Sequence, residues 1–320
     1  MIGIFPNGSC VTEFLILGFS HSPNQKVPLF LIFLLIYLFT VLSNLVIIVL
    51  ICLDRKLHKP MYFFLCNMSV LDISYTSVTS PNFLHIILSE NKRISFRACM
   101  AQLFLFNSLG SVEYMLLTSM AYDRYQAICN PLHYCQTMNR KRSLILSTVS
   151  WVGGFIAALP ISIFISALSY CSSNTINHIF CDMSPLLTLA CDDTSSTELL
   201  VFVEGVFICL NCFILTAISY TFIISDIIKI CSFKGRVKAF STCVSHLTVV
   251  ILFYASITCM YMKPTSSSSL NEEKALSVLY INIVPMLNPI IYTLRNKEVK
   301  EAAQKLYQVL STEIFKNKVK

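Results

Sequence analysis

Seven long stretches of apolar residues dominate this chain of 320 residues. A helix that crosses a bilayer needs about 20 mostly apolar residues, and each stretch reaches that length. Only 13% of the residues are charged, whereas a soluble domain averages about 25%. The stretches are Val27–Leu53, Met61–Ser80, Ala98–Ala121, Ser143–Leu168, Leu199–Ile228, Lys238–Met262 and Asn271–Leu294. The sequence therefore predicts an all-α membrane protein, a bundle of seven transmembrane helices.

The distribution of lysine and arginine orients this bundle. One alternating set of connections, which includes the C-terminal tail, holds 18 of the 24 basic residues, and the other set holds 6. Cytoplasmic loops carry the excess of positive charge. We therefore expect an extracellular segment over residues 1–26, the helix bundle over 27–294 and a cytoplasmic tail over 295–320. Because the basic residues are dispersed in this way, the formal charge of +7 does not indicate a nucleic-acid partner.

Two features at the ends of the chain fit this orientation. Asn7-Gly8-Ser9 is a glycosylation acceptor, which the orientation places outside the cell, so Asn7 is a predicted glycosylation site. In the tail, apolar residues recur at helical spacing among Lys and Glu. We expect a short amphipathic helix on the inner leaflet, with an irregular tail as the alternative. Its apolar residues are Val299, Ala302, Ala303, Leu306 and Leu310.

Several motifs occur at the cytoplasmic ends of the predicted helices. The third stretch leads into Met120–Cys129, which contains Asp-Arg-Tyr, and charges at such a depth are costly and usually functional. Leu57–Leu65 reads Leu-His-Lys-Pro-Met-Tyr-Phe-Phe-Leu, Lys238–His246 reads Lys-Ala-Phe-Ser-Thr-Cys-Val-Ser-His, and Pro285–Asn296 contains Asn-Pro-Ile-Ile-Tyr. In this order the motifs resemble the olfactory receptors, a branch of the rhodopsin-like G-protein-coupled receptors. The resemblance covers nearly the whole chain.

This resemblance implies a function and a place in the cell. The expected activity is binding of a small, mostly apolar volatile molecule in the outer half of the bundle. Binding is expected to activate a heterotrimeric G protein of the stimulatory, olfactory type and to raise cAMP. The expected location is the plasma membrane in the cilia of olfactory sensory neurons, where membrane lipid surrounds the helices. The alternative is a receptor of the same fold for a non-odour metabolite in another tissue. No catalytic cluster is apparent, so we do not expect an enzyme.

The resemblance also implies a set of switch residues beside the G protein. No acidic residue occurs from Arg236 to His246, so we expect Arg124 to rest against Asp123 or against polar groups of the sixth helix. Pro289 removes a backbone donor and kinks the seventh helix, and we expect Asn288 to satisfy the freed carbonyls. The complete set is Asp123, Arg124, Tyr125, Tyr220, His246, Asn288, Pro289 and Tyr292.

Two carboxylates, Asp72 and Glu113, lie deep in the predicted membrane region. Glu113 precedes Arg124 by about three helical turns, so both lie on roughly one helix face. A buried carboxylate needs a partner, a proton or an ion. The resemblance implies a sodium-ion or water site at Asp72 and Glu113; the alternative is a protonated, hydrogen-bonded pair. No other cofactor is expected.

The long loop after the fourth helix contains Cys171, Cys181 and Cys191, each separated by nine residues. It faces the oxidising side of the membrane. Spacing alone does not fix how these cysteines pair. The resemblance implies Cys99–Cys181, which ties the loop to the third helix, and Cys171–Cys191 within the loop.

Candidate ligand-binding residues follow from depth and helix face. Glu204 would pair with an amine or, in the alternative, face water at the helix mouth. Two residues depart from the family pattern: Ser43, and Gln126, which we expect to place a polar group near the G-protein surface. The predicted wall consists of Phe106, Asn107, Gly110, Ser111, Val203, Glu204, Phe207, Ile208, Tyr254, Ile257, Thr258, Tyr261, Val278 and Ile281.

Overall fold

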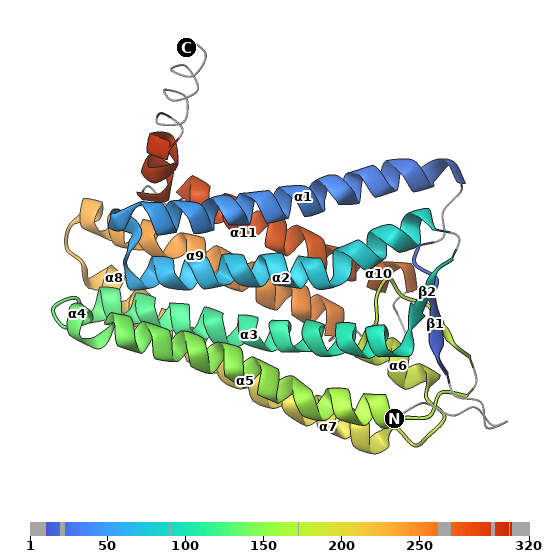
Figure 1. The fold of residues 1–320 in the computed structure, drawn as a ribbon. Helices are drawn as coiled ribbons and strands as arrows, with labels where there is room; N and C mark the ends of the chain where they lie inside the picture. Colours follow the sequence, from blue (N-terminus) through green and yellow to red (C-terminus); the bar gives the residue numbers. More distant parts are fainter. Residues whose placement is uncertain are drawn as a thin grey trace, which may run out of the picture.

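Seven long helices run side by side through the described part of the computed structural model (Figure 1). The structure describes residues 11–19, 23–89, 91–171, 173–261, 270–295, 298–306 and 308. The predicted bundle is thus confirmed, while Asn7, Leu310 and the side chain of Tyr261 lie outside the described residues. The spans are α1 (Pro23–Leu53), α2 (Pro60–Leu88), α3 (Phe96–Cys129), α5 (Arg140–Ala167), α7 to α8 (Ser195–Lys229), α9 (Phe233–Tyr261) and α10 to α11 (Leu270–Arg295).

The fifth and seventh spans each contain one π-helical turn. In the fifth, η2 (Val206–Leu210) joins α7 (Ser195–Gly205) to α8 (Asn211–Lys229). In the seventh, η3 (Leu279–Ile283) joins α10 (Leu270–Val278) to α11 (Val284–Arg295). A π turn inserts an extra residue, so it changes which side chains face the bundle on either side of it.

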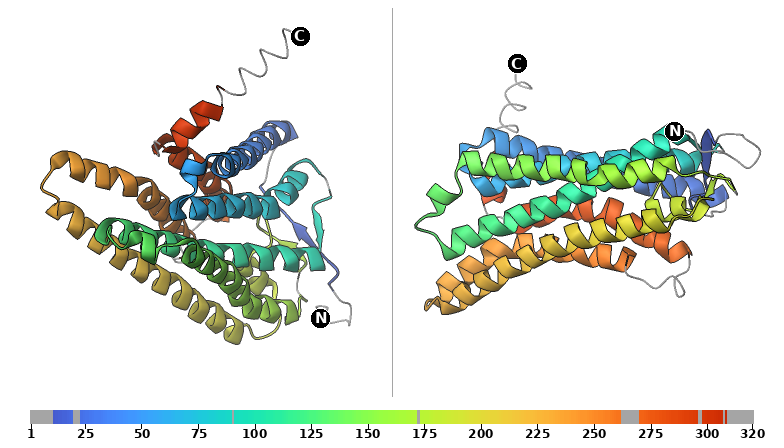
Figure 2. Two further views of the ribbon diagram at one scale, coloured as in Figure 1. Left: turned by 60° about the vertical axis from the view of Figure 1, so that its left-hand side comes forward. Right: turned by 90° about the horizontal axis from the view of Figure 1, so that it is seen from below.

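α3 is the central helix and packs against α2, α5 and α8 (Figure 2). Four spans are apolar enough by themselves to cross a membrane, and the bent α9 is a fifth. α2 and α3 are less apolar because they lie inside the bundle, where polar groups find protein partners. For example, the Asn67 amide on α2 accepts hydrogen bonds from Ser147 Oγ at 2.8 Å and Trp151 Nε1 at 3.0 Å on α5.

A close approach of α3 and α5 depends on glycine. A Cβ atom placed on Gly154 would lie 2.5 Å from Val112 Cγ2 and 2.6 Å from the Val112 backbone nitrogen. At the neighbouring Gly153, a Cβ would meet only the flexible end of Met115, at 3.0 Å. Small residues let membrane helices approach at this distance.

A small sheet covers the extracellular end of the bundle, which the sequence analysis did not predict. Its strand order is β2 (Arg93–Ser95), β1 (Glu13–Ile16), β3 (Thr175–Ile176). The N-terminal β1 pairs antiparallel with β2 and parallel with β3. Gly18 follows at φ +66°, a conformation that favours glycine. We call this sheet, together with the described residues of the loop that connects α5 to α7, the roof.

Both disulfides that the resemblance implied are present, Cys99–Cys181 and Cys171–Cys191. Lys274 on α10 fastens the roof to the seventh helix, since its Nζ donates to Gly18 O and Asn177 Oδ1, each at 2.7 Å. This lysine is only 3% exposed. Gln102 fastens the roof to α3, because its Oε1 accepts from the Cys181 backbone N–H at 3.0 Å.

Two buried titratable groups of the roof should have opposite effects on stability. Burial, together with the Lys274 ammonium, lowers the pKa of His178 to about 4, and burial raises the pKa of Asp182 to about 6. Free histidine titrates at about 6.5. Between about pH 4 and 6.5 the unfolded chain therefore binds more protons at His178, so acidification through that window favours unfolding. At Asp182 the folded chain binds more protons between about pH 4 and 6, so acidification favours folding.

These opposing terms give a testable result for Asp182→Asn. The melting temperature of the native receptor should change little through these two groups between pH 6.5 and 4. On acidification from pH 6.5 to 4, the free energy of unfolding of the Asp182→Asn variant should fall by up to about 3 kcal/mol, because only the effect of His178 protonation remains. Thermal unfolding in detergent at several pH values measures this, with the double variant Asp182→Asn/His178→Gln as the control. A pH dependence equal to that of the native receptor would contradict the assignment.

Candidate functional site

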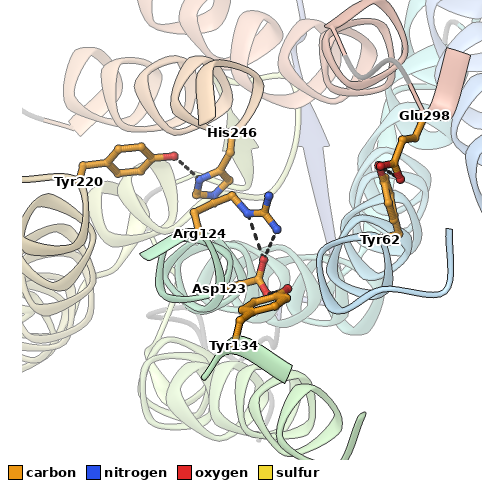
Figure 3. Close-up of polar contacts among 7 residues, drawn as sticks. All are labelled: Tyr62, Asp123, Arg124, Tyr134, Tyr220, His246 and Glu298. Carbon is orange, nitrogen blue, oxygen red and sulfur yellow. Dashed lines mark hydrogen bonds and ion pairs between the residues drawn. The ribbon is translucent and has the colours of Figure 1, made fainter. Parts of the chain in front are cut away.

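The polar latch at the cytoplasmic end of α3 consists of Asp123, Arg124 and Tyr134 (Figure 3). Arg124 Nε donates to Asp123 Oδ2 at 3.0 Å, and Arg124 Nη2 donates to the same oxygen. The side chains are 8% and 0% exposed for Arg124 and Asp123. The prediction that Arg124 rests on Asp123 is thus confirmed over the alternative of the sixth helix.

Tyr134 is the third member, which the sequence analysis missed. It opens α4 (Tyr134–Thr137), a short helix in the second cytoplasmic loop, and its hydroxyl donates to Asp123 Oδ1 at 2.8 Å. Burial and the Asp123 carboxylate raise the pKa of Tyr134 above its usual range, so the hydroxyl stays protonated and donates. Each Asp123 oxygen is thereby occupied by a different partner.

A second contact joins the fifth and sixth helices beside this latch (Figure 3). Tyr220 OH and His246 Nδ1 are 2.6 Å apart, and the two rings are stacked with an interplanar angle of 16°. Tyr220 belongs to a buried apolar cluster that also contains Cys243, and Tyr125 packs against this cluster. The structure thus brings Tyr125, Tyr220 and His246 together with Arg124 at one end of the bundle.

The carboxylates of the core lie one layer deeper. Asn288 Nδ2 donates to both oxygens of Asp72, at 3.0 and 3.2 Å. This differs from the prediction, since Asn288 binds a side chain on α2 and not the carbonyls freed by Pro289. Its Oδ1 and the Tyr292 hydroxyl are buried without a hydrogen-bond partner among the described residues. Glu113 is 5% exposed, and its carboxyl group makes no hydrogen bond with the residues that the structure describes.

In the outer half, aromatic residues fill the space that the sequence analysis assigned to a ligand. Phe106 is 3% exposed, and its ring centroid lies 4.6 Å from that of Phe180 in the roof and 5.0 Å from that of Tyr75. A cavity of about 10 Å³ remains beneath the roof. That is room for about one water molecule. It is lined by Thr79, Ser80, Phe83, Ile179, Phe180, Ile281 and Asn282.

A larger hollow of about 450 Å³ lies between α8 and α9, and we call it the five–six groove. Two predicted wall residues, Tyr254 and Thr258, line it. Ile251 at its edge is 58% exposed, so the groove opens towards the outside of the bundle. The groove is lined by Phe213, Val250, Ile251, Tyr254, Ala255, Thr258 and Cys259.

Other predicted wall residues take different positions. In the part of the chain that the structure describes, Asn107 Nδ2, Glu204 Oε2 and Tyr254 OH are buried without hydrogen-bond partners. A Cβ on Gly110 would lie 3.7 Å from the Tyr280 hydroxyl, so Gly110 faces the seventh helix. The partly buried residues are Ser111, Ile208, Ile257 and Val278.

Two predictions at single positions are contradicted. Phe207 and Val203 are 70% and 53% exposed, so the fifth helix turns them away from the bundle. The physical reason is the π turn at Val206–Leu210, which interrupts the regular spacing of faces. Gln126 is 8% exposed, and its Oε1 accepts from Asn130 Nδ2 at 3.4 Å, so its side chain packs inside the helix end. A polar group near the G-protein surface stays a prediction for this residue.

Comparison with solved structures defines the class of fold. The chain matches the crystal structure of squid rhodopsin with a TM-score of 0.70 at 18% identity, covering 92% of this chain and 84% of the rhodopsin chain. The fold is that of the rhodopsin-type bundle of seven transmembrane helices.

Comparison with sequences defines the family. The sequence profile of the olfactory receptor family matches residues 33–309. Olfactory receptor 5AR1 of Mus musculus is 47% identical over 94% of this chain and 97% of its own length. Olfactory receptor 5B21 of Homo sapiens is 46% identical over 95% of this chain and 98% of its own length. The chain belongs to the olfactory receptor family, whose members are multi-pass G-protein-coupled receptors and not enzymes.

Proposed function

We propose that this receptor binds a small, mostly apolar volatile molecule with one polar group and responds by activating a stimulatory G protein that raises cAMP. The observation that carries the ligand class is the set of three buried polar atoms without partners, on Asn107, Glu204 and Tyr254. A buried polar atom without a partner costs about 1–3 kcal/mol, so a ligand that supplies one hydrogen bond recovers part of that cost.

The five–six groove offers enough room for such a molecule. Its volume of about 450 Å³ falls within the usual range for ligand sites, about 300–1,000 Å³. Tyr254 contributes both its ring and its unpartnered hydroxyl. The site of action is the plasma membrane, and we propose the cilia of olfactory sensory neurons.

The buried latch supports the proposed coupling. An ion pair at Asp123 and Arg124 that is closed to solvent represents a resting arrangement, which a ligand opens only by binding the active arrangement more tightly. The ligand site and the latch lie in opposite halves of the bundle. They therefore communicate through movement of the helices.

The test is cAMP in cells that express the receptor with a stimulatory G protein, screened against volatile molecules, amines and non-odour metabolites. We expect a response to at least one volatile molecule that disappears in the Arg124→Ala variant at equal surface expression. A response confined to amines and abolished by Glu204→Gln would identify Glu204 as the counter-ion. A response only to non-volatile metabolites, or one that survives Arg124→Ala, would contradict the proposal.

We also propose that Asp72 and Glu113 hold a sodium ion. Carboxylate oxygens suit a hard cation, and among the residues that the structure describes neither the Glu113 carboxyl group nor Asn288 Oδ1 has a hydrogen-bond partner. Thermal unfolding in sodium chloride and in choline chloride tests this. Sodium should raise the melting temperature of the native receptor and leave that of Glu113→Gln unchanged. Equal melting temperatures in the two salts would indicate a protonated pair.

A further inference from the structure

The tail forms a helix over residues 298–306 that packs on the cytoplasmic end of the bundle (Figure 1). Its apolar face does not rest on lipid alone. Val299 and Ala302 are 0% and 4% exposed and belong to the same buried cluster as Leu57 and Met61, which flank the start of α2. This burial holds the helix against the bundle, but apolar contact by itself is non-directional.

The first polar contact occurs where this helix begins. Lys59 Nζ lies 2.8 Å from Glu298 Oε1 and 2.7 Å from Glu298 Oε2. The Tyr62 hydroxyl donates to Glu298 Oε2 at 3.0 Å (Figure 3). Tyr62 is 5% exposed, so this bond is shielded from water on one side. Partial burial raises the pKa of Glu298, but the donors from Lys59 and Tyr62 outweigh it and lower the pKa overall.

The second contact lies further along the same helix. Lys305 Nζ is 3.7 Å from Asp54 Oδ2. Asp54 is itself fixed, because its Oδ1 accepts from the Lys56 backbone N–H at 3.0 Å and caps the 3₁₀ turn η1 (Arg55–Leu57). Glu298 and Lys305 are separated by about two helical turns, so both face the loop.

The two contacts have opposite polarity. The acid Glu298 on the tail meets the base Lys59 on the loop, and the base Lys305 on the tail meets the acid Asp54. If the helix lay in the reverse direction, Glu298 would face Asp54 and Lys305 would face Lys59, and both pairs would repel. Charge order of this kind selects orientation more than it adds affinity.

We propose that Asp54, Lys59, Tyr62, Glu298 and Lys305 form a cytoplasmic clip that fixes the position and direction of the tail helix and thereby restrains the end of the seventh helix. Tyr292, one of the proposed switch residues, lies six residues before Glu298. Lys59 and Tyr62 are positioning residues in this proposal. The proposal gives a physical role to two members of the Leu57–Leu65 motif.

Hydrogen exchange on the purified receptor in lipid nanodiscs tests the clip without ligand or G protein. The variants are Lys59→Glu, Glu298→Lys and the double exchange Lys59→Glu/Glu298→Lys. Lys300→Glu is the matched control, because it makes the same substitution as Lys59→Glu at an exposed position of the tail helix. Each single reversal should lower the protection of the backbone amides of 299–306 about fivefold or more, since it replaces attraction by repulsion. The double exchange should restore protection, and the control should leave it unchanged.

Two outcomes of the exchange experiment would overturn the clip. One is protection in both single variants equal to that of the native receptor. The other is a double exchange that stays as unprotected as the single variants, which would show that the residues matter for reasons other than their mutual attraction.

Basal cAMP in cells tests the restraint, which rests on the proposed function. The single reversals should raise basal cAMP at least twofold relative to Lys300→Glu at equal surface expression, and the double exchange should return it to the native level. Loss of amide protection without a rise in basal cAMP would overturn the restraint and leave the clip in place. If the receptor does not couple through cAMP at all, adding Arg124→Ala will leave the basal cAMP of the native receptor and of every clip variant unchanged, which identifies a failure of the proposed function.

Discussion

Replacing Gly154 with alanine should destabilise the receptor by about 3 kcal/mol or more, at the upper end of the cost of overpacking. The new Cβ would lie 2.5 Å from Val112 Cγ2, 2.6 Å from the Val112 nitrogen and 3.0 Å from the Ser108 carbonyl oxygen. Two of these three atoms belong to the backbone of α3. No change of rotamer relieves the contact, so α3 and α5 must move apart. Because α3 also packs against α2 and α8, the displacement propagates through the bundle.

Gly153→Ala is the matched control for this prediction. It adds the same methyl group to the same helix and gains the same helix propensity, about 1 kcal/mol. Its Cβ meets only the sulfur and terminal methyl of Met115, which have room to rotate. Surface expression and melting temperature of the two variants measure the difference. Equal values for Gly154→Ala and Gly153→Ala would show that the two helices do not depend on this close approach.

Asp123→Asn should produce the largest change in basal signalling. The substitution keeps the shape of the side chain but leaves the Arg124 guanidinium buried and without a counter-charge. Removing one partner of a buried ion pair costs about 3–5 kcal/mol. If the active arrangement exposes Arg124 to the G protein, that cost falls on the resting arrangement. The ratio of active to resting receptor should then rise by about a hundredfold or more.

Basal cAMP per receptor at the cell surface measures this effect. Tyr134→Phe should raise it in the same direction but less, because it removes one hydrogen bond to the carboxylate, worth about 1.5–3 kcal/mol. The double variant Asp123→Asn/Arg124→Ala should be silent. Basal cAMP of Asp123→Asn at the native level would indicate that the buried pair is not what keeps the receptor at rest.

Spans that are apolar throughout were the easiest to predict. The second helix was harder, because polar residues interrupt its apolar sequence. The predicted span ended at Ser80, whereas α2 continues to Leu88 through Ser80-Pro81-Asn82. In the sequence, these residues indicated the end of the span. In the structure Ser80 is 2% exposed and donates to Asn282 Oδ1 on the seventh helix at 3.0 Å. A polar residue that is satisfied by a distant helix cannot be distinguished, in one sequence, from one that faces water.

The site shows the same limit. Arg124 and Asp123 are adjacent in the chain, and the absence of an acid on the sixth helix narrowed the expected partners of Arg124 to Asp123 or polar groups of that helix. Tyr134 reaches Asp123 only because the second cytoplasmic loop folds into α4, and no periodic pattern marks that turn. Phe207 was assigned by regular helical spacing, which the π turn at Val206–Leu210 interrupts. Predictions that depended on local spacing failed where the backbone departed from that spacing.

The order of strands in the roof has a consequence for the synthesis of this protein. β1 lies at the start of the chain, yet its parallel partner β3 follows about 160 residues later. At a rate of about 5–20 residues per second, the ribosome needs roughly 8–32 s to make that interval. During this time β1, with its apolar side chains Phe14 and Ile16, lies in the oxidising lumen without its partner β3. The extracellular end is therefore completed only after four of the seven spans have been made, and this delay leaves the strand open to chaperones and to pairing with the wrong chain.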